Sequence, residues 1–326
     1  MPLTLPPTED LRTPLIEAYA ERSPLHKNIL QLFSVIYEPV SKALLLECLK
    51  HSKVRDNNKK PFTTTTLAPH LELLIRANLL IQEKGFGPQC HPLIVEIVTR
   101  DAVKTKTFET WANTVEEMLP LRQRWKDGPR TFSSDRQLLR EVRIGLYRND
   151  LKFINRQFED CYRYSYHSRS IGMDDIFAQV CNNPFDKDWF RTLPTELYST
   201  GILSLLSSAT QQLQPCDELF SLLQEDCIAQ GAAWPNRMRM LFLDQLLWRG
   251  RLQDVKQQLD QLPETSRDHY QVFWGWTAFW SGDYEQAIIH YAAALKYLRD
   301  LQKKRKVYFD TVSGVFYVLA LIKEGS

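Results

Sequence analysis

The chain has 326 residues, of which 44% are hydrophobic and 25% are charged, and its formal net charge is +2. This composition is ordinary for a globular protein, and the length allows two domains or one small domain with an extended repeat array. Twelve glycines are few for this length, which argues against a glycine-rich nucleotide-binding fold, and the small net charge gives no general preference for nucleic acid.

The N-terminus and the cysteines exclude further classes of protein. Residues 1–7 carry neither a basic start nor an apolar core, so we expect no signal peptide. No apolar stretch approaches the roughly 20 residues that cross a bilayer, so no membrane partner is expected. The six cysteines are scattered without a CxxC pair, as in a protein of the reducing cytoplasm, and we expect a cytoplasmic location. They are Cys48, Cys90, Cys161, Cys181, Cys216 and Cys227.

Helix N-cap signals organise the first quarter of the chain. Residues 1–22 form an N-terminal lead that carries prolines and, from Leu11 onward, a short helical pattern. Ser23 followed by Pro24 predicts an N-cap with proline in the first helical turn. Ser41 caps a second predicted helix, and the run Thr63-Thr64-Thr65-Thr66 supplies the cap of a third after a polar loop. Three successive helices are therefore expected before residue 78.

A change of pattern after the third helix predicts a β-hairpin. Residues 79–83 suit a strand, 84–88 a turn and 89–91 a returning strand, and a further helix follows from His91. Three helices and a hairpin in this order are the winged-helix variant of the helix-turn-helix arrangement, which we assign to residues 23–106. The stretch ANLLIQEKGFGPQCHPLIVEIV resembles the wing and following helix of winged-helix domains in STAND-type signalling ATPases and related regulators.

The remainder, residues 107–326, shows helical periodicity without strand alternation. Its clearest segment, FWGWTAFWSGDYEQAIIHYAAALKYL, resembles a tetratricopeptide (TPR) repeat. Gly275 and Ala287 would let two helices approach closely, and large aromatic residues would fill the space beside them. The packing residues expected of this repeat are Trp274, Gly275, Gly282, Tyr284, Ala287, Tyr291 and Ala294.

Two weaker segments repeat this pattern. Gly250 lies 32 residues before Gly282, close to the roughly 34-residue period of TPR arrays. Asn149 and Asp150 mark a turn between two further amphipathic helices. The fold class that follows is mostly α: a winged-helix domain of three helices and a β-hairpin, followed by a TPR-like α-superhelix.

The sequence lacks the motifs of catalysis. It has no GxxxxGK[ST] motif and no glycine cluster to cradle phosphates, so we do not expect this chain to hydrolyse ATP. Its seven histidines include no HExxH or other metal-ligand pair. Adjacent acidic residues such as Asp174 and Asp175 face different directions on a helix and make a poor acid–base pair. We therefore expect no enzyme, no catalytic residue, no cofactor and no metal.

DNA contact is an alternative role for the winged helix. Cations in the loop before its third helix would contact phosphate, together with polar residues on that helix and a lysine in the wing. The candidate residues are Lys53, Arg55, Lys59, Lys60, Thr64, Thr66, His70 and Lys84. The competing interpretations are a solvated loop and a winged helix that serves only as a spacer or protein-docking unit. A solvated turn between helices also explains the basic run at residues 303–306.

These patterns predict a non-catalytic module for protein interaction and regulation. A winged helix combined with helical repeats resembles the accessory regions of large bacterial Swi/Snf-type helicases and parts of STAND ATPases. The resemblance implies the N-terminal part of a larger ATP-dependent motor or signalling ATPase. Its partner would be another protein or the remainder of a longer chain. The alternative is a free-standing DNA-binding regulator with TPR-like sensor repeats.

Overall fold

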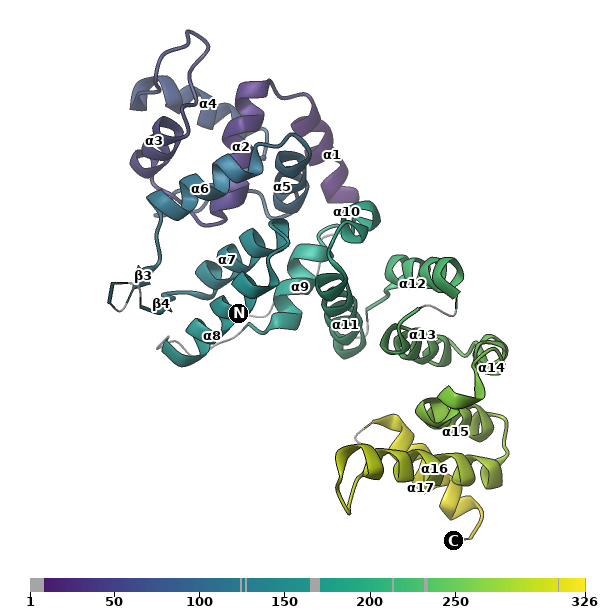
Figure 1. Cartoon of the computed structure of the whole chain (residues 1–326). Coiled ribbons are helices and arrows are strands. Elements are labelled where there is room, and N and C mark those ends of the chain that lie inside the picture. Colours follow the sequence, from purple (N-terminus) through teal and green to yellow (C-terminus); the bar gives the residue numbers. More distant parts are fainter. Residues whose placement is uncertain are drawn as a thin grey trace. The chain divides into compact units, whose positions relative to one another are not determined.

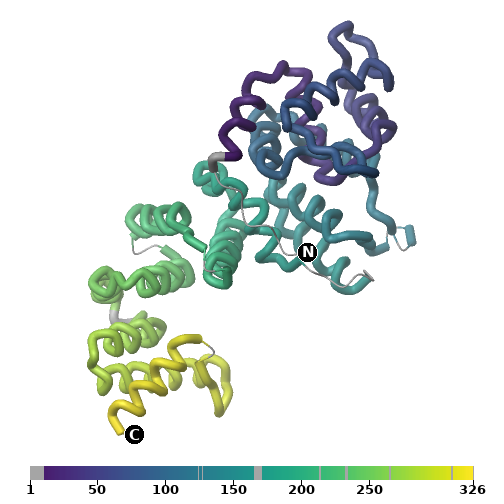
Figure 2. The backbone as a smooth tube through the Cα atoms, turned by 180° about the vertical axis from the view of Figure 1, so that it is seen from behind, coloured from purple at the N-terminus to yellow at the C-terminus, as the bar shows by residue number. Residues whose placement is uncertain are grey.

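Helices make up most of the fold, which confirms the predicted mostly-α class. The computed structural model describes residues 9–123, 125, 126, 128–164, 171–212, 214–231, 234–309 and 311–325. These residues contain seventeen α-helices and four very short strands, drawn in Figures 1 and 2. They divide into two units, residues 1–215 and 216–326. Of the predicted N-terminal lead 1–22, residues 1–8 lie outside the described residues, and the first helix occupies most of the rest.

The first unit consists of helices with two short β pairs between them. Its helices are α1 (Glu9–Ala20), α2 (Pro24–Ile36), α3 (Lys42–His51), α4 (Thr64–Arg76), α5 (Val95–Lys104), α6 (Phe108–Met118), α7 (Asp135–Tyr147), α8 (Leu151–Tyr164), α9 (Met173–Cys181), α10 (Lys187–Arg191) and α11 (Thr195–Gln212). Its strands are β1 (Leu80–Gln82), β2 (Pro88–Cys90), β3 (Arg122–Gln123) and β4 (Arg130–Thr131).

The three predicted N-caps are confirmed. The side-chain oxygens of Ser23, Ser41 and Thr63 each accept a hydrogen bond from the backbone N–H three residues later, at 3.2–3.4 Å. Such bonds satisfy N–H groups that the first helical turn leaves without a partner. Local sequence therefore determines where α2, α3 and α4 begin.

The predicted hairpin is also confirmed. Strands β1 and β2 pair antiparallel, with Leu80 opposite Cys90. The backbone N–H of Val40, in the link between α2 and α3, donates to the carbonyl of Pro88 at 3.2 Å. A Cβ at Gly87 would collide with the Val40 backbone, so this approach requires glycine. The next helix, α5, begins at Val95 and not at His91 because a turn, closed by the Ile94 N–H on the His91 carbonyl, comes first.

A second β pair corrects the expectation that strands are absent after residue 107. Strands β3 and β4 pair antiparallel over two residues each, with Arg122 opposite Thr131 and Gln123 opposite Arg130. Two residues are too few to produce a visible alternation of apolar and polar side chains. The pair lies between α6 and α7, within the region predicted to be purely helical.

Helix α6 packs on α2 and α3, and a glutamine of α2 links α2 to both α5 and α6. The Gln31 amide nitrogen on α2 donates to Asp101 of α5 at 2.9 Å. The Gln31 amide oxygen accepts from the Thr107 hydroxyl at 2.8 Å and from the indole nitrogen of Trp111 at 3.2 Å. The sequence boundary at residues 106/107 therefore lies inside the first unit, within one set of hydrogen bonds.

The second unit is a succession of helices. They are α12 (Asp217–Gln230), α13 (Asn236–Trp248), α14 (Leu252–Asp260), the 3-10 helix η2 (Glu264–Tyr270), α15 (Gln271–Trp280), α16 (Tyr284–Gln302) and α17 (Val312–Lys323). Consecutive helices contact one another, and α17 lies against both α15 and α16 (Figure 2). Each helical pair thus buries its apolar face on its neighbours.

One turn recurs at the ends of several helices. Gly250, Gly282 and Gly325 each lie two residues after a helix end, with φ of 68°, 78° and 72°. Each donates its N–H to the carbonyl three residues earlier. Asn149 takes the same place between α7 and α8, with φ of 59°. The turns predicted at Gly250, Gly282 and Asn149 are present, and their left-handed backbone explains why glycine or asparagine occupies them.

Among the described residues, no helix combines the length and the apolar character needed to cross a bilayer.

Candidate interaction surfaces

The loop between α3 and α4 presents four cations on an ordered turn. The Asp56 carboxylate accepts the N–H groups of Asn58 at 2.9 Å and Lys60 at 2.8 Å, and Arg55 forms a β-bridge with Pro61. The side chains of Lys53, Arg55, Lys59 and Lys60 are all exposed. Within the described part of the chain, none of these four cations takes part in an ion pair. The loop therefore carries four exposed cations against the single carboxylate of Asp56.

The remaining residues proposed for DNA contact differ from one another in exposure and in hydrogen-bond partners. Thr64 and Lys84 are exposed. The Thr66 hydroxyl already accepts the Thr63 backbone N–H at 2.9 Å as part of the α4 cap. His70 is partly buried, and its Nδ1 lies 2.9 Å from Nε2 of His26 on α2. Thr66 and His70 thus have structural partners, whereas the loop cations do not.

The outer face of α4 offers little that could distinguish bases. Pro69 and Glu72 are exposed there, and Leu73 is 40% exposed. Arg76 lies 4.0 Å from the Glu72 carboxylate, so the long cation of this face has an acidic neighbour. Base edges are recognised by freely placed arginine, lysine, asparagine or glutamine side chains. The outer face of α4 offers few side chains of this kind.

A buried ion pair holds α5 and α7 together in the first unit. Arg143 donates to both oxygens of Glu96, at 2.7 and 3.1 Å, and both side chains are 1% exposed. Arg143 also donates to the Ser34 carbonyl at 2.9 Å, and the Tyr147 hydroxyl donates to Glu96 at 2.8 Å. Burial disfavours the charged guanidinium, but the carboxylate outweighs it and raises the pKa of Arg143. The pair therefore has a structural role.

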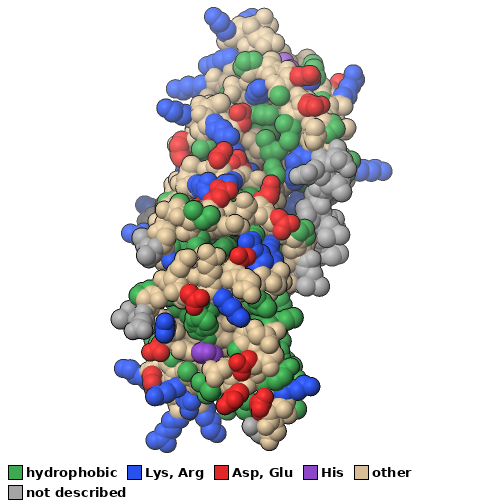
Figure 3. Space-filling model, turned by 90° about the vertical axis from the view of Figure 1, so that its right-hand side faces the viewer, with side chains coloured by type: hydrophobic (Ala, Val, Ile, Leu, Met, Phe, Trp, Pro, Cys, Tyr) green, Lys and Arg blue, Asp and Glu red, His purple; other side chains and the backbone are tan. Residues whose placement is uncertain are grey.

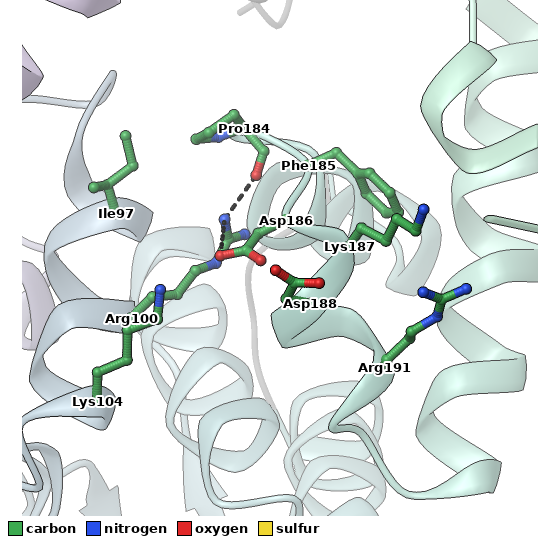
Figure 4. A pocket seen from close by; sticks show the side chains of 9 residues that line it. All are labelled: Ile97, Arg100, Lys104, Pro184, Phe185, Asp186, Lys187, Asp188 and Arg191. Carbon is green, nitrogen blue, oxygen red and sulfur yellow. Dashed lines mark hydrogen bonds and ion pairs between the residues drawn. The ribbon is translucent and has the colours of Figure 1, made fainter. Parts of the chain in front are cut away.

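A pocket of about 520 Å³ lies between α5 and α10 (Figure 4). Lys104 and Arg191 stand on opposite sides of it, and Asp186 lies beside Arg100. Arg100 is 3% exposed and donates to the carbonyls of Pro184 at 2.8 Å and Val180 at 2.9 Å. Its guanidinium therefore holds the segment between α9 and α10 in place. Arg100 thus has a packing role, whereas Lys104, Asp188 and Arg191 are exposed.

Three buried cysteines, Cys48, Cys90 and Cys181, lie where the reactive thiolate is disfavoured. Burial raises the pKa of Cys48 to about 11 and the pKa of Cys90 and Cys181 to about 12, so these thiols are protonated at neutral pH. In the described part of the chain, no group of three His, Cys, Asp or Glu side chains could hold a metal ion.

The residues predicted to pack the TPR-like repeat lie between α15 and α16. A Cβ at Gly275 would lie 2.9 Å from the Tyr291 ring, and Ala287 and Tyr291 are 0% exposed. Trp274 stacks on His290 at 6.1 Å between ring centroids. The other predicted residues also take packing or turn positions, with Tyr284 edge-on to Phe279, Ala294 5% exposed and Gly282 in the turn. The close approach of the two helices therefore depends on the glycine.

Two tryptophans of the second unit are exposed. Trp248 is 53% exposed and Trp280 is 59% exposed, and each is the last residue of its helix. Trp248 rests edge-on against buried Trp276 at 5.5 Å, and Trp280 against Phe316 at 6.2 Å. Both precede a turn glycine by two residues, which is the shared signal in the sequence.

Helix α17 has an exposed apolar face as well as a buried face. The sequence pattern did not distinguish the two. Val315, Val318, Leu319 and Ile322 are 56%, 53%, 43% and 64% exposed. Ser313 and Ala320, on the opposite side, are buried. Figure 3 shows, on the face that it draws, hydrophobic side chains reaching the surface among charged ones.

A comparison of the chain with protein families, curated proteins and solved structures finds no match.

Proposed function

We propose that the chain is a non-catalytic docking module, in which a winged-helix domain is followed by TPR-like helical hairpins that bind a protein. In this proposal α2, α3, α4 and the β1–β2 hairpin form the winged helix. The module serves a larger ATP-dependent motor or signalling ATPase, as the resemblance of its sequence implies. The observation that carries the proposal is the pair of exposed tryptophans at equivalent turns, Trp248 and Trp280.

The tryptophans have the properties of interface anchors. Each is more than half exposed, yet each is supported from below by another aromatic ring, so its orientation is restrained before a partner arrives. Tryptophan is enriched among the few residues that dominate binding energy, and restraint lowers the entropy lost on binding. Because the two side chains occupy the same position of successive hairpins, they form a spaced pair along the array.

The test is site-specific photo-cross-linking in cells that express the chain naturally. A photoreactive phenylalanine analogue would replace Trp248, Trp280 or, as the control, Trp125, which is 57% exposed in the first unit. We expect the same cross-linked protein from positions 248 and 280 and not from 125. The double substitution Trp248→Ala with Trp280→Ala should abolish recovery of that protein. Cross-links of equal yield at all three positions, or at none, would refute the proposal.

A second candidate function, a DNA-binding regulator, rests on the four unpaired cations of the α3–α4 loop. These cations would contact the phosphate backbone of duplex DNA, and each phosphate neutralised contributes about −0.9 to the log–log dependence of affinity on salt. The exposed face of α4 predicts little sequence preference.

The chain supplies a matched control for this second candidate. One variant replaces Lys53, Arg55, Lys59 and Lys60 with Gln, and the other replaces Lys303, Lys304, Arg305 and Lys306 with Gln. Both remove three lysines and one arginine from exposed positions. DNA binding through the loop predicts that only the first variant flattens the salt dependence. Equal losses would indicate attraction by general charge, and an absence of binding at low salt would exclude the function.

A further inference from the structure

The segment that holds β3, β4 and α8 carries an excess of positive charge. Residues 122–164 contain eleven Lys or Arg and six Asp or Glu. Three of these acids are engaged by their neighbours. Glu141 accepts from the buried Arg140 guanidinium at 2.9 Å, Asp160 accepts a backbone N–H of β4 at 3.2 Å, and Asp150 accepts a backbone N–H in the first turn of α8 at 2.9 Å. The fold thus uses several carboxylates internally and leaves cations at the surface.

Five cations of this segment are exposed, and they lie on neighbouring elements. They are Arg122 on β3, Lys126 in the turn, and Lys152, Arg156 and Arg163 on α8. The three on α8 are spaced by four and seven residues, so they share one face and extend over about 16 Å. Strand β4 packs on α8, beside which Figure 1 draws the β3–β4 pair. Arg156 lies 3.9 Å from the same Asp160 oxygen that accepts the N–H of β4, so this face of α8 adjoins the strand pair.

Two aromatic side chains are exposed among these cations. Trp125, in the turn between β3 and β4, is 57% exposed, and Tyr162 on α8 is 61% exposed. A Cβ at Gly128 would lie 2.8 Å from three atoms of the Trp125 indole, so the ring packs on the glycine backbone. The Gly128 N–H also closes the turn by donating to the Trp125 carbonyl at 2.9 Å. The indole is therefore held in place while much of it stays accessible.

We propose that this basic aromatic surface binds single-stranded nucleic acid. Its residues are Arg122, Trp125, Lys126, Lys152, Tyr162 and Arg163. The cations contact the phosphate backbone, and the two rings stack on bases. Positive charge alone would suit any polyanion, whereas exposed rings add affinity for flat bases. Base faces are accessible only where a strand is unpaired, which favours a single strand over a duplex.

The proposal predicts how the surface discriminates between ligands. Phosphates and base faces are common to RNA and DNA, so both are expected to bind, with little sequence preference. The surface is separate from the tryptophan pair of the second unit and from the α3–α4 loop. The inference therefore does not depend on the docking function or on duplex binding by that loop.

The first test removes the stacking ring. Binding of the full chain to fluorescent oligo(dT) and oligo(U) of about 15 nucleotides, near the length that one such site covers, is followed by anisotropy. We expect Trp125→Ala to weaken binding of both about tenfold or more. Trp125→Phe keeps a stacking ring and should retain most of the affinity, whereas Trp125→Leu keeps only bulk and should behave as the alanine variant. Trp280→Ala removes an exposed tryptophan of the second unit and should leave binding unchanged.

The second test removes the charges. One variant replaces Arg122, Lys126, Lys152 and Arg163 with Gln. The control replaces residues 303–306 with Gln, which also removes four exposed cations. We expect only the first variant to flatten the fall of affinity with rising salt, because only its cations neutralise phosphates.

Three results would overturn the proposal. They are an absence of binding at low salt, equal affinity for a duplex of the same length, and wild-type affinity in Trp125→Leu. Competition by polyglutamate as strong as that by oligo(dT) would also overturn it and would indicate an acidic protein partner. A preference for oligo(U) or for oligo(dT) would support it and assign the natural ligand as RNA or DNA. Failure to cross-link a protein at Trp248 and Trp280 would refute the docking function without altering these results.

Discussion

In the first unit a guanidinium and a carboxylate, each 1% exposed, link α5 to α7, whereas in the second unit a glycine and a tyrosine ring make the contact between α15 and α16. The first contact joins Glu96 to Arg143, and the second joins Gly275 to Tyr291 within one hairpin. Buried charges are stable only with all their partners in place, while apolar contacts depend on shape. The first unit therefore has a single admissible arrangement of distant segments, and the second is assembled from neighbouring helices.

The largest effect should come from breaking the buried ion pair. Arg143→Ala leaves Glu96 buried without its cation, and we expect a loss of about 3–5 kcal/mol in the free energy of unfolding of the first unit. Hydrogen exchange of α5 and α7 in a denaturant series would measure it. Arg148→Ala is the control, because its pairs with Glu109 and Glu116 are partly exposed and should contribute about 1 kcal/mol or less. Equal losses in the two variants would show that burial does not set the contribution of the Glu96–Arg143 pair.

The apolar contact of the second unit should fail by overpacking. Gly275→Leu places a large side chain where even a Cβ lies 2.9 Å from the Tyr291 ring, and we expect about 1–3 kcal/mol of destabilisation. Thermal unfolding monitored by circular dichroism would report it. Ala292→Leu, on the exposed side of α16, adds comparable bulk and should leave the melting temperature nearly unchanged. An unaltered melting temperature in Gly275→Leu would show that the helices can separate without loss.

A carboxylate in the second unit sharpens the comparison, because among the described residues it has no cation in an ion pair, unlike Glu96 in the first unit. Burial raises the pKa of Asp244 to about 6, although a hydrogen bond from Trp248 lowers it. Because the folded-state pKa of Asp244 is raised, this group contributes its full stabilisation of the folded state below its ordinary pKa near 4. That stabilisation is lost as the pH rises through about 6. Asp244→Asn should therefore stabilise the second unit at pH 8 by on the order of 2 kcal/mol and have little effect at pH 4. Asp260→Asn, at an exposed position of α14, is the control variant.

The smallest effect concerns the two histidines that join α2 to α4. Burial, followed by the charges of His70 and Arg22, lowers the pKa of His26. A lowered folded-state pKa gives stability that is present above pH 6.5 and is lost as the pH falls through the folded value. We expect acidification to pH 5 to reduce the melting temperature of the first unit by roughly 1–3 °C, since the rings are partly exposed. His26→Gln should remove this dependence, and an identical acid response in that variant would assign it to other groups.

Local signals explain which parts of this structure could be predicted from sequence. Ser23, Ser41 and Thr63 act on backbone groups three residues away, so the starts of three helices were predictable. Gly275 and Tyr291 belong to one repeated pattern and were predicted together. The bond between Glu96 and Arg143 spans 47 residues and follows no periodicity, so it could not be foreseen. Nor does composition separate exposed Trp248 from buried Trp276, because exposure depends on which helix lies above each ring.

The two ends of the Gln31 amide have a consequence for how the first unit folds. One end can only donate and is used by α5, while the other can only accept and is used by the start of α6. Helices α5 and α6 can therefore each reach their final positions on α2 only when the Gln31 amide has the correct orientation. Docking of either helix sets the amide orientation that the other helix requires. We expect residues 24–118 to unfold as one cooperative block, with α6 lost only when α5 is lost.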